Sequence, residues 1–160
     1  MIIEHTIENV EAKVLISNQL LERMYEFASE YYPDEFGGIL SGFREGNRIV
    51  VVDFETPSKI ESNGNKFVRH ADNLNVYLSD IYQVSEGILE YIGEWLSHPG
   101  SSAQYSSNDK QSMIQISKDK KVKINNPIMV ILSIVQRANS YKLYMVQDDR
   151  IVWMNKILLS

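Results

Sequence analysis

Residues 93–99 read Gly-Glu-Trp-Leu-Ser-His-Pro, and residues 106–109 read Ser-Ser-Asn-Asp. Successive side chains of a strand point to opposite faces, so Leu96 and His98 are predicted to share one face near the strand's end. The proline that follows is expected to end the strand, and Asp109 falls in the first turn of a predicted helix. An imidazole at a strand end and a carboxylate at a helix start can converge on one ion. This pair of donors suits Zn²⁺.

A second acidic residue, Glu35, precedes the stretch Phe-Gly-Gly-Ile-Leu-Ser-Gly at residues 36–42. Paired glycines in a predicted strand indicate close approach of another backbone or of a ligand. If this strand lies beside the strand that ends at His98, Glu35 reaches the same point and could act as general base to a metal-bound water. Ser106 could donate a hydrogen bond to a developing oxyanion.

Each of these residues also has a purely structural interpretation. Ser106-x-x-Asp109 is close to a helix capping box, with Asp in place of Glu, and taken alone it favours capping. A lone histidine before proline, such as His98, is more typical of a hydrogen-bonded structural residue, and Glu35 alone could be a surface acid. Only the combination of these residues in register favours a functional site.

The remaining pattern predicts an α/β fold of the α+β type, with a mixed, mostly antiparallel central sheet flanked by helices. We expect a single domain over residues 1–160, with residues 56–65 as an exposed loop. Ser17 is a plausible N-cap for the first helix, and Pro33 stops it. Helices are predicted over residues 17–31, 73–87 and about 106–117, and strands over 35–42, 48–54, 89–97, 127–136, 141–147 and 150–158, the last two forming a hairpin around residues 148–149.

The composition narrows the function classes further. The formal net charge is −5, which argues against nucleic acid as the main partner, because phosphate binding needs a dense basic surface. The most basic run, Lys118 to Lys123, is interrupted by Asp119 and is interpreted as a solvated helix end. The chain has no cysteine, so thiolate metal sites and cysteine nucleophiles are excluded. No signal peptide or membrane-spanning stretch is predicted, and a cytoplasmic protein with no membrane partner is expected.

At the quoted residues the sequence resembles the JAMM (MPN/JAB) metalloprotease family, in its small prokaryotic type. The family's pattern is a glutamate before a Gly-Gly strand, then His-x-His-Pro, seven residues, and Ser-x-x-Asp. Here Glu35 precedes the glycine pair, seven residues separate His98 from Ser106, and Asp109 follows in register. The resemblance covers nearly the whole chain and implies an MPN/JAB-like (cytidine-deaminase-like) fold.

The resemblance implies that His98 and Asp109 are zinc ligands, Glu35 the base and Ser106 the oxyanion donor. The implied reaction is hydrolysis of a peptide or isopeptide bond at the C-terminus of a ubiquitin-like protein. The implied partners are that protein or its conjugate, beside activating and conjugating enzymes. The resemblance to the small prokaryotic members of the family also implies a role in antiviral defence.

Leu96 departs from this pattern, since it stands where the family has its first ligand histidine. Two protein ligands hold Zn²⁺ far less well than the three typical of catalytic sites, so weak or absent activity is expected. Replacement ligands from His5, His70 or Glu94 are not expected, because no spacing requires either histidine and Glu94 lies about 7 Å further along the strand. Leu96 is either the native residue or an introduced substitution that inactivates the enzyme. The retained polar residues favour a recent loss.

Two rival interpretations remain open beside the impaired enzyme. The domain could be a catalytically inactive scaffold that binds a ubiquitin-like or other protein partner. Alternatively, the match could be a coincidence in some other α+β domain, which a large separation of Glu35 from His98 would favour.

Overall fold

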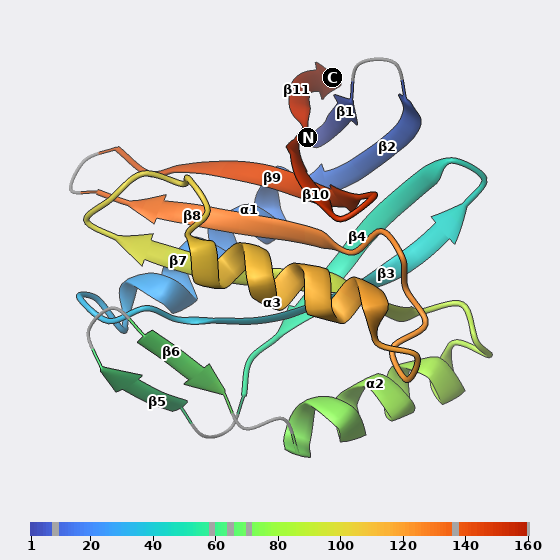
Figure 1. Ribbon diagram of the computed structural model, residues 1–160, viewed down its shortest axis with the longest axis horizontal. Coiled ribbons are helices and arrows are strands. Elements are labelled where there is room, and N and C mark those ends of the chain that lie inside the picture. Colours follow the sequence, from blue (N-terminus) through green and yellow to red (C-terminus); the bar gives the residue numbers. More distant parts are fainter. Residues whose placement is uncertain (8–9, 58–59, 64–65, 70–71, 136–137, 160) are drawn as a thin grey trace.

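A computed structural model describes the chain except for residues 8–9, 58–59, 64–65, 70–71, 136–137 and 160 (Figure 1). Its helices are α1 (Asn18–Ser29), α2 (Asp72–Val84) and α3 (Ser107–Lys118), and its strands are β1 (Ile2–Ile7), β2 (Val10–Ser17), β3 (Gly37–Glu45), β4 (Arg48–Glu55), β5 (Ile60–Asn63), β6 (Lys66–Arg69), β7 (Glu90–Pro99), β8 (Ile128–Ile134), β9 (Ser140–Gln147), β10 (Arg150–Trp153) and β11 (Asn155–Leu159).

The predicted sheet architecture is confirmed. Nine strands form one sheet in the order β10-β9-β8-β7-β3-β4-β2-β1-β11. Among the strand pairs that the structure describes, only β2–β4 and β7–β8 are parallel, so the sheet is mixed and mostly antiparallel. The three predicted helices form near their expected positions, and the side chain of Ser17 accepts a hydrogen bond from the backbone N–H of Leu20 as the first N-cap.

The predicted loop over residues 56–65 is wrong in part. Within it lies β5, which pairs with β6 in a separate antiparallel sheet of two strands. This pairing joins backbone groups and needs no alternation of apolar side chains, so the polar composition of the stretch gave no signal for it.

Three other expectations need correction. The predicted strand over residues 150–158 breaks at Met154 into β10 and β11, which lie at opposite ends of the strand order. The strand ending near Ser97 continues as β7 through His98 and Pro99, paired with β8. Strands β1 and β2 were not predicted, although Val10, Ala12 and Val14 alternate with charged residues in β2 as in a half-buried strand.

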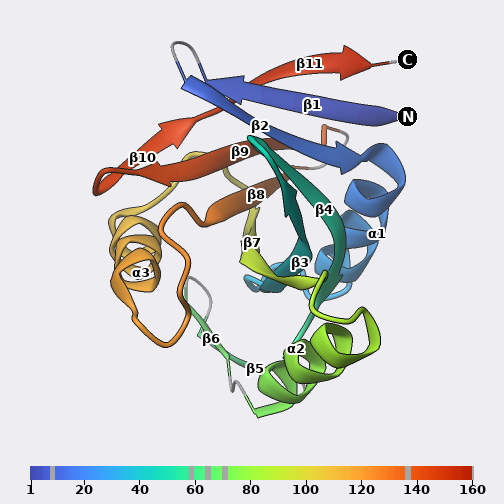
Figure 2. The ribbon, with the colours of Figure 1, turned by 90° about the vertical axis from the view of Figure 1, so that its right-hand side faces the viewer.

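The sheet carries apolar side chains on both of its faces. In β8, Ile128, Val130 and Leu132 join a large core cluster on the side of α1, whereas Met129 and Ile131 join a smaller cluster on the side of α3. Figure 2 shows α1 and α3 on opposite sides of the sheet. A strand buried on both faces reads as a continuous apolar run, which is the pattern that predicted β8.

The sheet is strongly curled, so that its two ends approach each other. Met154 alone links β10 to β11, and β1 and β11 cross over β9 (Figure 2). The contact is polar at one point, where the imidazole Nε2 of His5 in β1 lies 2.9 Å from the hydroxyl of Tyr141 in β9. This curl places the N-terminal strands against the C-terminal half of the chain.

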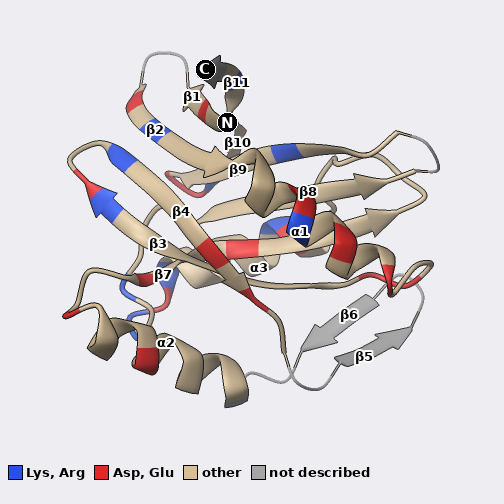
Figure 3. Cartoon of the chain, turned by 180° about the vertical axis from the view of Figure 1, so that it is seen from behind, with Lys and Arg blue, Asp and Glu red and all other residues tan. Residues whose placement is uncertain are grey.

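Charged residues of both signs are interspersed over the face in Figure 3, and the described basic residues form no continuous stripe there. Among the described residues, no helix is both long enough and apolar enough to cross a membrane.

Candidate functional site

Strand β7 positions two sets of side chains on opposite faces. Trp95 and Ser97 are buried on the side of α1, whereas Leu96 and His98 face the side of α3. Ser97 links β7 to the segment before β3: its backbone N–H donates to the Phe36 carbonyl at 2.7 Å, and its hydroxyl accepts from the Phe36 N–H at 3.0 Å. These two bonds hold Glu35, the neighbour of Phe36, beside the end of β7.

The glycine pair before Ile39 allows this close approach. A Cβ on Gly37 would lie 2.1 Å from the carbonyl oxygen of Trp95, and one on Gly38 would lie 2.0 Å from the carbonyl oxygen of Glu55. Gly37 therefore faces the backbone of β7, and Gly38 faces that of β4. The prediction that these glycines mark a close backbone approach is confirmed.

His98 and Asp109 form a direct pair at the end of β7. His98 Nε2 lies 3.1 Å from Asp109 Oδ2, and His98 Nδ1 lies 3.0 Å from the backbone carbonyl of Ser102. A carbonyl only accepts, so Nδ1 carries a hydrogen. An ionised carboxylate also only accepts, so Nε2 needs a second hydrogen for the 3.1 Å contact to be favourable. A doubly protonated His98 that faces an ionised Asp109 would satisfy both contacts.

The electrostatics of the two side chains favour the same pairing. Burial by itself lowers the pKa of His98, but hydrogen bonds to Asp109 and Ser102, with the charges of Asp109 and Glu35, raise the pKa above its usual value. Burial by itself raises the pKa of the Asp109 carboxyl. The hydrogen bonds to His98 and Ser106 outweigh burial and hold this pKa below its ordinary range.

Ser106 and Asp109 form the capping box of α3. Ser106 Oγ accepts from the Asp109 backbone N–H at 3.1 Å, and the Ser106 N–H donates to Asp109 Oδ2 at 2.8 Å. The capping interpretation is therefore confirmed, and the cap fixes the carboxylate that faces His98. The Ser106 side chain also hydrogen-bonds to the Asp109 carboxyl and helps to lower its pKa, and the oxyanion role of Ser106 stays a prediction.

Glu35 is half-buried just before β3. Burial raises the pKa of its carboxyl group to about 6, the charge of His98 lowers it, and that of Asp109 raises it. The carboxyl thus lies within electrostatic reach of both partners, and it titrates near neutral pH as a general base should. The structure brings the three predicted side chains together, while their catalytic roles stay predictions.

Leu96 lies between this polar group and the apolar cluster under α3. It packs, partly buried, against side chains that include Met129 and Ile131, and it pairs in register with Gly37 of β3 and Ile131 of β8. The described residues contain no group of three or more His, Cys, Asp or Glu side chains placed to hold one metal ion. The donors present, His98 and Asp109, do not fit the three-ligand zinc of a catalytic site.

The replacement ligands considered for Leu96 are engaged elsewhere or lie outside the described residues. Glu94 accepts a hydrogen bond from the hydroxyl of Tyr91 at 2.6 Å. His5 is buried in β1, where its ring nitrogens contact the Val14 carbonyl and the Tyr141 hydroxyl. His70 lies outside the described residues.

Sequence reasoning missed two residues that position the site, Ser97 and Ser102. Ser97 could have been found, because a polar residue at an inward position of a buried strand needs a nearby partner. Ser102 contributes only its backbone carbonyl, which no side-chain pattern reveals.

Comparisons with known proteins identify the family of the chain. The family described as "Prokaryotic homologs of the JAB domain" matches residues 17–145, and the chain belongs to this family. The recognition made from the motif residues is thereby confirmed.

Two relatives are each named CD-NTase/cGAS isopeptidase. The one from Escherichia coli is 26% identical over 68% of this chain and 70% of its own length. The one from Enterobacter hormaechei is 29% identical over 81% of this chain and 72% of its own length. The solution structure of a Desulfitobacterium hafniense protein matches the fold with a TM-score of 0.62, at 19% identity and over 86% of both chains.

Proposed function

We propose that this chain is a JAB-type isopeptidase domain for a bond at the C-terminus of a ubiquitin-like protein, and that Leu96 impairs it. The observation that carries the proposal is the 3.1 Å pair of His98 and Asp109 at the end of β7, with Glu35 in electrostatic reach. Membership of the JAB family supports it, as do two relatives named as isopeptidases. Zinc dependence, a cytoplasmic location and a setting in antiviral defence belong to the proposal.

The residues present support part of this chemistry. Glu35, with a pKa of about 6, can take a proton from water at neutral pH and return it to a leaving amine. Ser106, which caps α3 beside the pair of His98 and Asp109, is the proposed donor to a developing oxyanion. The missing element is a third donor at position 96, and the chain as it stands is expected to turn over weakly or not at all.

The test is the variant Leu96→His, which restores an imidazole beside His98. We expect about one equivalent of bound zinc per chain by elemental analysis, together with cleavage of a ubiquitin-like protein conjugate. The names of the relatives make a conjugate of a CD-NTase the first substrate to assay.

Two matched variants locate the effect. Leu96→His combined with Asp109→Ala keeps the new histidine and should lose the zinc, because one expected ligand is gone. Leu96→His combined with Glu35→Gln should keep the zinc and lose the turnover, because only the proposed base is gone. A folded Leu96→His protein that binds no more zinc than the unmodified chain would count against the proposal.

A second function, a binding scaffold without turnover, is favoured by two observations. His98 and Asp109 satisfy each other directly, and Leu96 contributes to an apolar cluster. The unmodified chain is to be titrated with a ubiquitin-like protein alongside a cleavage assay. Tight binding without turnover, and no gain of activity in Leu96→His, would establish the scaffold over the enzyme.

A further inference from the structure

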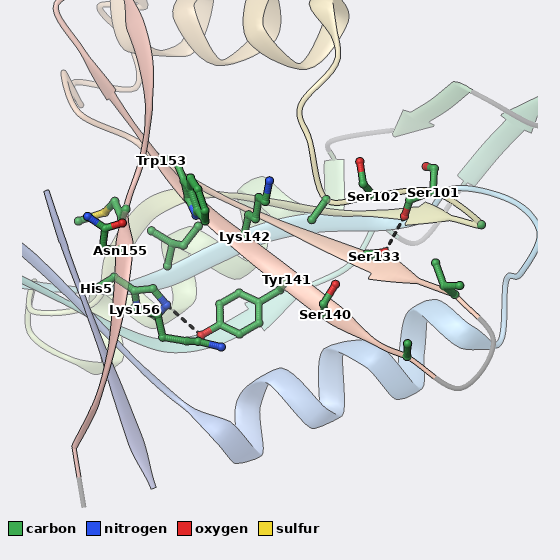
Figure 4. Close-up of a pocket in the computed structure, with 16 residues that line it drawn as sticks. His5, Ser101, Ser102, Ser133, Ser140, Tyr141, Lys142, Trp153, Asn155 and Lys156 are labelled. Atoms are coloured by element: carbon green, nitrogen blue, oxygen red, sulfur yellow. Dashed lines mark hydrogen bonds between the residues drawn. The ribbon is translucent and has the colours of Figure 1, made fainter.

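A second feature of the molecule is a cavity of about 630 Å³ at the edge of β9, shown in Figure 4. Its walls come from the loop of residues 100–103, the ends of β8 and β9, and the crossing of β10 into β11. Glu35, His98 and Asp109 are not among the residues that line it. The loop nevertheless connects the two places, because the carbonyl of Ser102 binds His98 and Ser102 also lines the cavity.

The cavity extends around the edge of one strand. In β9, Tyr141 and Leu143 belong with the core cluster on the side of α1, whereas the neighbouring Tyr144 belongs with the cluster under α3. By strand alternation Lys142 points to the side of α3, where it meets Trp153 of β10. β10 pairs with β9 over residues 144–147, so among the described residues the segment 140–142 has no strand partner on that side, and the cavity forms a groove along this open edge.

Two lysines supply the charge of this groove, one on each face of β9. Lys142 Nζ lies 4.6 Å from the ring centre of Trp153, and Lys156 Nζ lies 5.3 Å from that of Tyr141. Among the residues that the structure describes, no Asp or Glu lines the groove. Burial lowers the pKa of the lining residue His5 to about 4, so its ring is neutral at pH 7. The groove is thus locally positive in a chain whose net charge is −5.

We propose that this groove binds an extended acidic segment of a partner protein, laid along the edge of β9. Successive side chains of an extended peptide point to opposite faces, so neighbouring acidic residues can approach Lys142 on one face and Lys156 on the other. The exposed Trp153 ring, with 56% of its surface accessible, offers apolar contact beside the charges.

This inference concerns recognition and does not require the cleavage proposed above. Binding is measured directly on the unmodified full chain, in which Leu96 is present. A failure of Leu96→His to gain zinc therefore leaves the groove proposal untouched, and a failure of peptide binding leaves the isopeptidase proposal untouched.

The experiment titrates the chain with a ten-residue amide-capped peptide that carries an Asp-Glu-Asp-Glu core, and with the matched Asn-Gln-Asn-Gln peptide. Binding is followed by calorimetry and by tryptophan emission. The chain has two tryptophans, and Trp95 is 1% exposed, so an emission change reports Trp153. We expect the acidic peptide alone to bind and to shift the emission, with affinity falling as salt increases.

The charge-reversal variant Lys142→Glu with Lys156→Glu should weaken acidic-peptide binding at least tenfold. The matched control is Lys120→Glu with Lys121→Glu, which makes the same charge change at two exposed residues beyond α3. The control should bind like the unmodified chain. Equal losses in both variants, or equal binding of the neutral peptide, would overturn the proposal. Tighter binding of adenosine monophosphate than of the peptide, with displacement of the peptide, would overturn it in favour of a small-anion site.

Discussion

At the scale of single residues, position 96 decides what the end of β7 can do. The alternation of β7 gives Leu96 the same face as His98, so any side chain there borders both the polar pair and the apolar cluster under α3. Leucine contributes packing with Met129 and Ile131, and it offers no lone pair. A histidine there would exchange partly buried apolar contact for a third donor, so a small loss of stability is expected with the gain of metal affinity.

Gly37 is the residue whose size matters most for bringing Glu35 to the site. Gly37→Ala places a methyl group against the carbonyl oxygen of Trp95, where it would lie at 2.1 Å, so β3 and β7 must separate. We expect a loss of about 3 kcal/mol or more in the free energy of unfolding, measured by urea denaturation.

The control for this variant is Gly46→Ala in the turn between β3 and β4. Gly46 has φ +63° and nothing within 4 Å of an added Cβ, so only the left-handed backbone opposes the change. Its cost should be roughly 1 kcal/mol. Equal costs at the two positions would show that the contact with β7 does not require glycine.

At the scale of elements, the first turn of α3 both begins a helix and holds the carboxylate of the site. Asp109 Oδ2 accepts a hydrogen bond from the Ser106 N–H at 2.8 Å and lies 3.1 Å from His98 Nε2. The capping box and the polar pair therefore share one oxygen atom. A motif that alone favours capping can therefore also position a functional residue, and the two interpretations of Ser106-x-x-Asp109 are compatible.

Removal of the cap should be measurable in stability. Ser106→Ala loses the bond from the Asp109 N–H and is expected to cost about 1 kcal/mol in the free energy of unfolding. Ser107→Ala alters the adjacent exposed serine, which is not the N-cap, and should change stability little. Urea denaturation of both variants tests this, and similar values for the two would contradict the capping role.

At the scale of the whole molecule, the curl of the sheet joins β1 to β9 through a buried histidine. Burial lowers the pKa of His5 to about 4, against the raising effect of its bond to Val14 and with a further lowering by the charge of Lys156. The neutral ring can donate from Nδ1 to the Val14 carbonyl and accept at Nε2 from the Tyr141 hydroxyl. A charged ring would donate from Nε2 to the Tyr141 oxygen instead, but its charge would be buried and would lie near that of Lys156.

This arrangement predicts that acid lowers the free energy of unfolding through His5. The unfolded chain protonates His5 near pH 6.5, whereas the folded chain resists protonation until about pH 4. The contribution of His5 to stability is therefore full above pH 6.5 and falls as the pH drops towards 4, by about 3 kcal/mol in total.

The control is His5→Gln, whose amide can donate and accept at similar positions without titrating. Unfolding free energies of both proteins, measured from pH 7 to pH 4, should converge as the pH falls. The difference between the two curves reports His5, because His98 is present in both proteins. The raised pKa of His98 makes its own contribution to stability grow as the pH falls. Parallel curves would show that His5 does not set this pH dependence.

Much of the fold was predictable because its central strands and helices carry strong local patterns. The run of apolar residues in β8 and the N-cap at Ser17 are examples, since burial on two faces and capping each leave a mark in adjacent residues. The short pair β5–β6 and the break at Met154 left no such mark. β5 and β6 pair with each other, but their polar residues carry no apolar alternation, and β11 pairs with β1 at the other end of the chain, which residues near Met154 do not encode.

The sequence by itself determined the family, the departure at Leu96, and the face that this residue shares with His98, because strand alternation and motif spacing are local properties. Only the tertiary structure decided that the Ser97 bonds to Phe36 bring Glu35 to the same place, and that His98 and Asp109 satisfy each other directly. It also decided where the curl forms a positively charged groove around β9. Distances across the sheet and the protonation they impose depend on packing between segments remote in sequence, and a residue pattern carries no record of that packing.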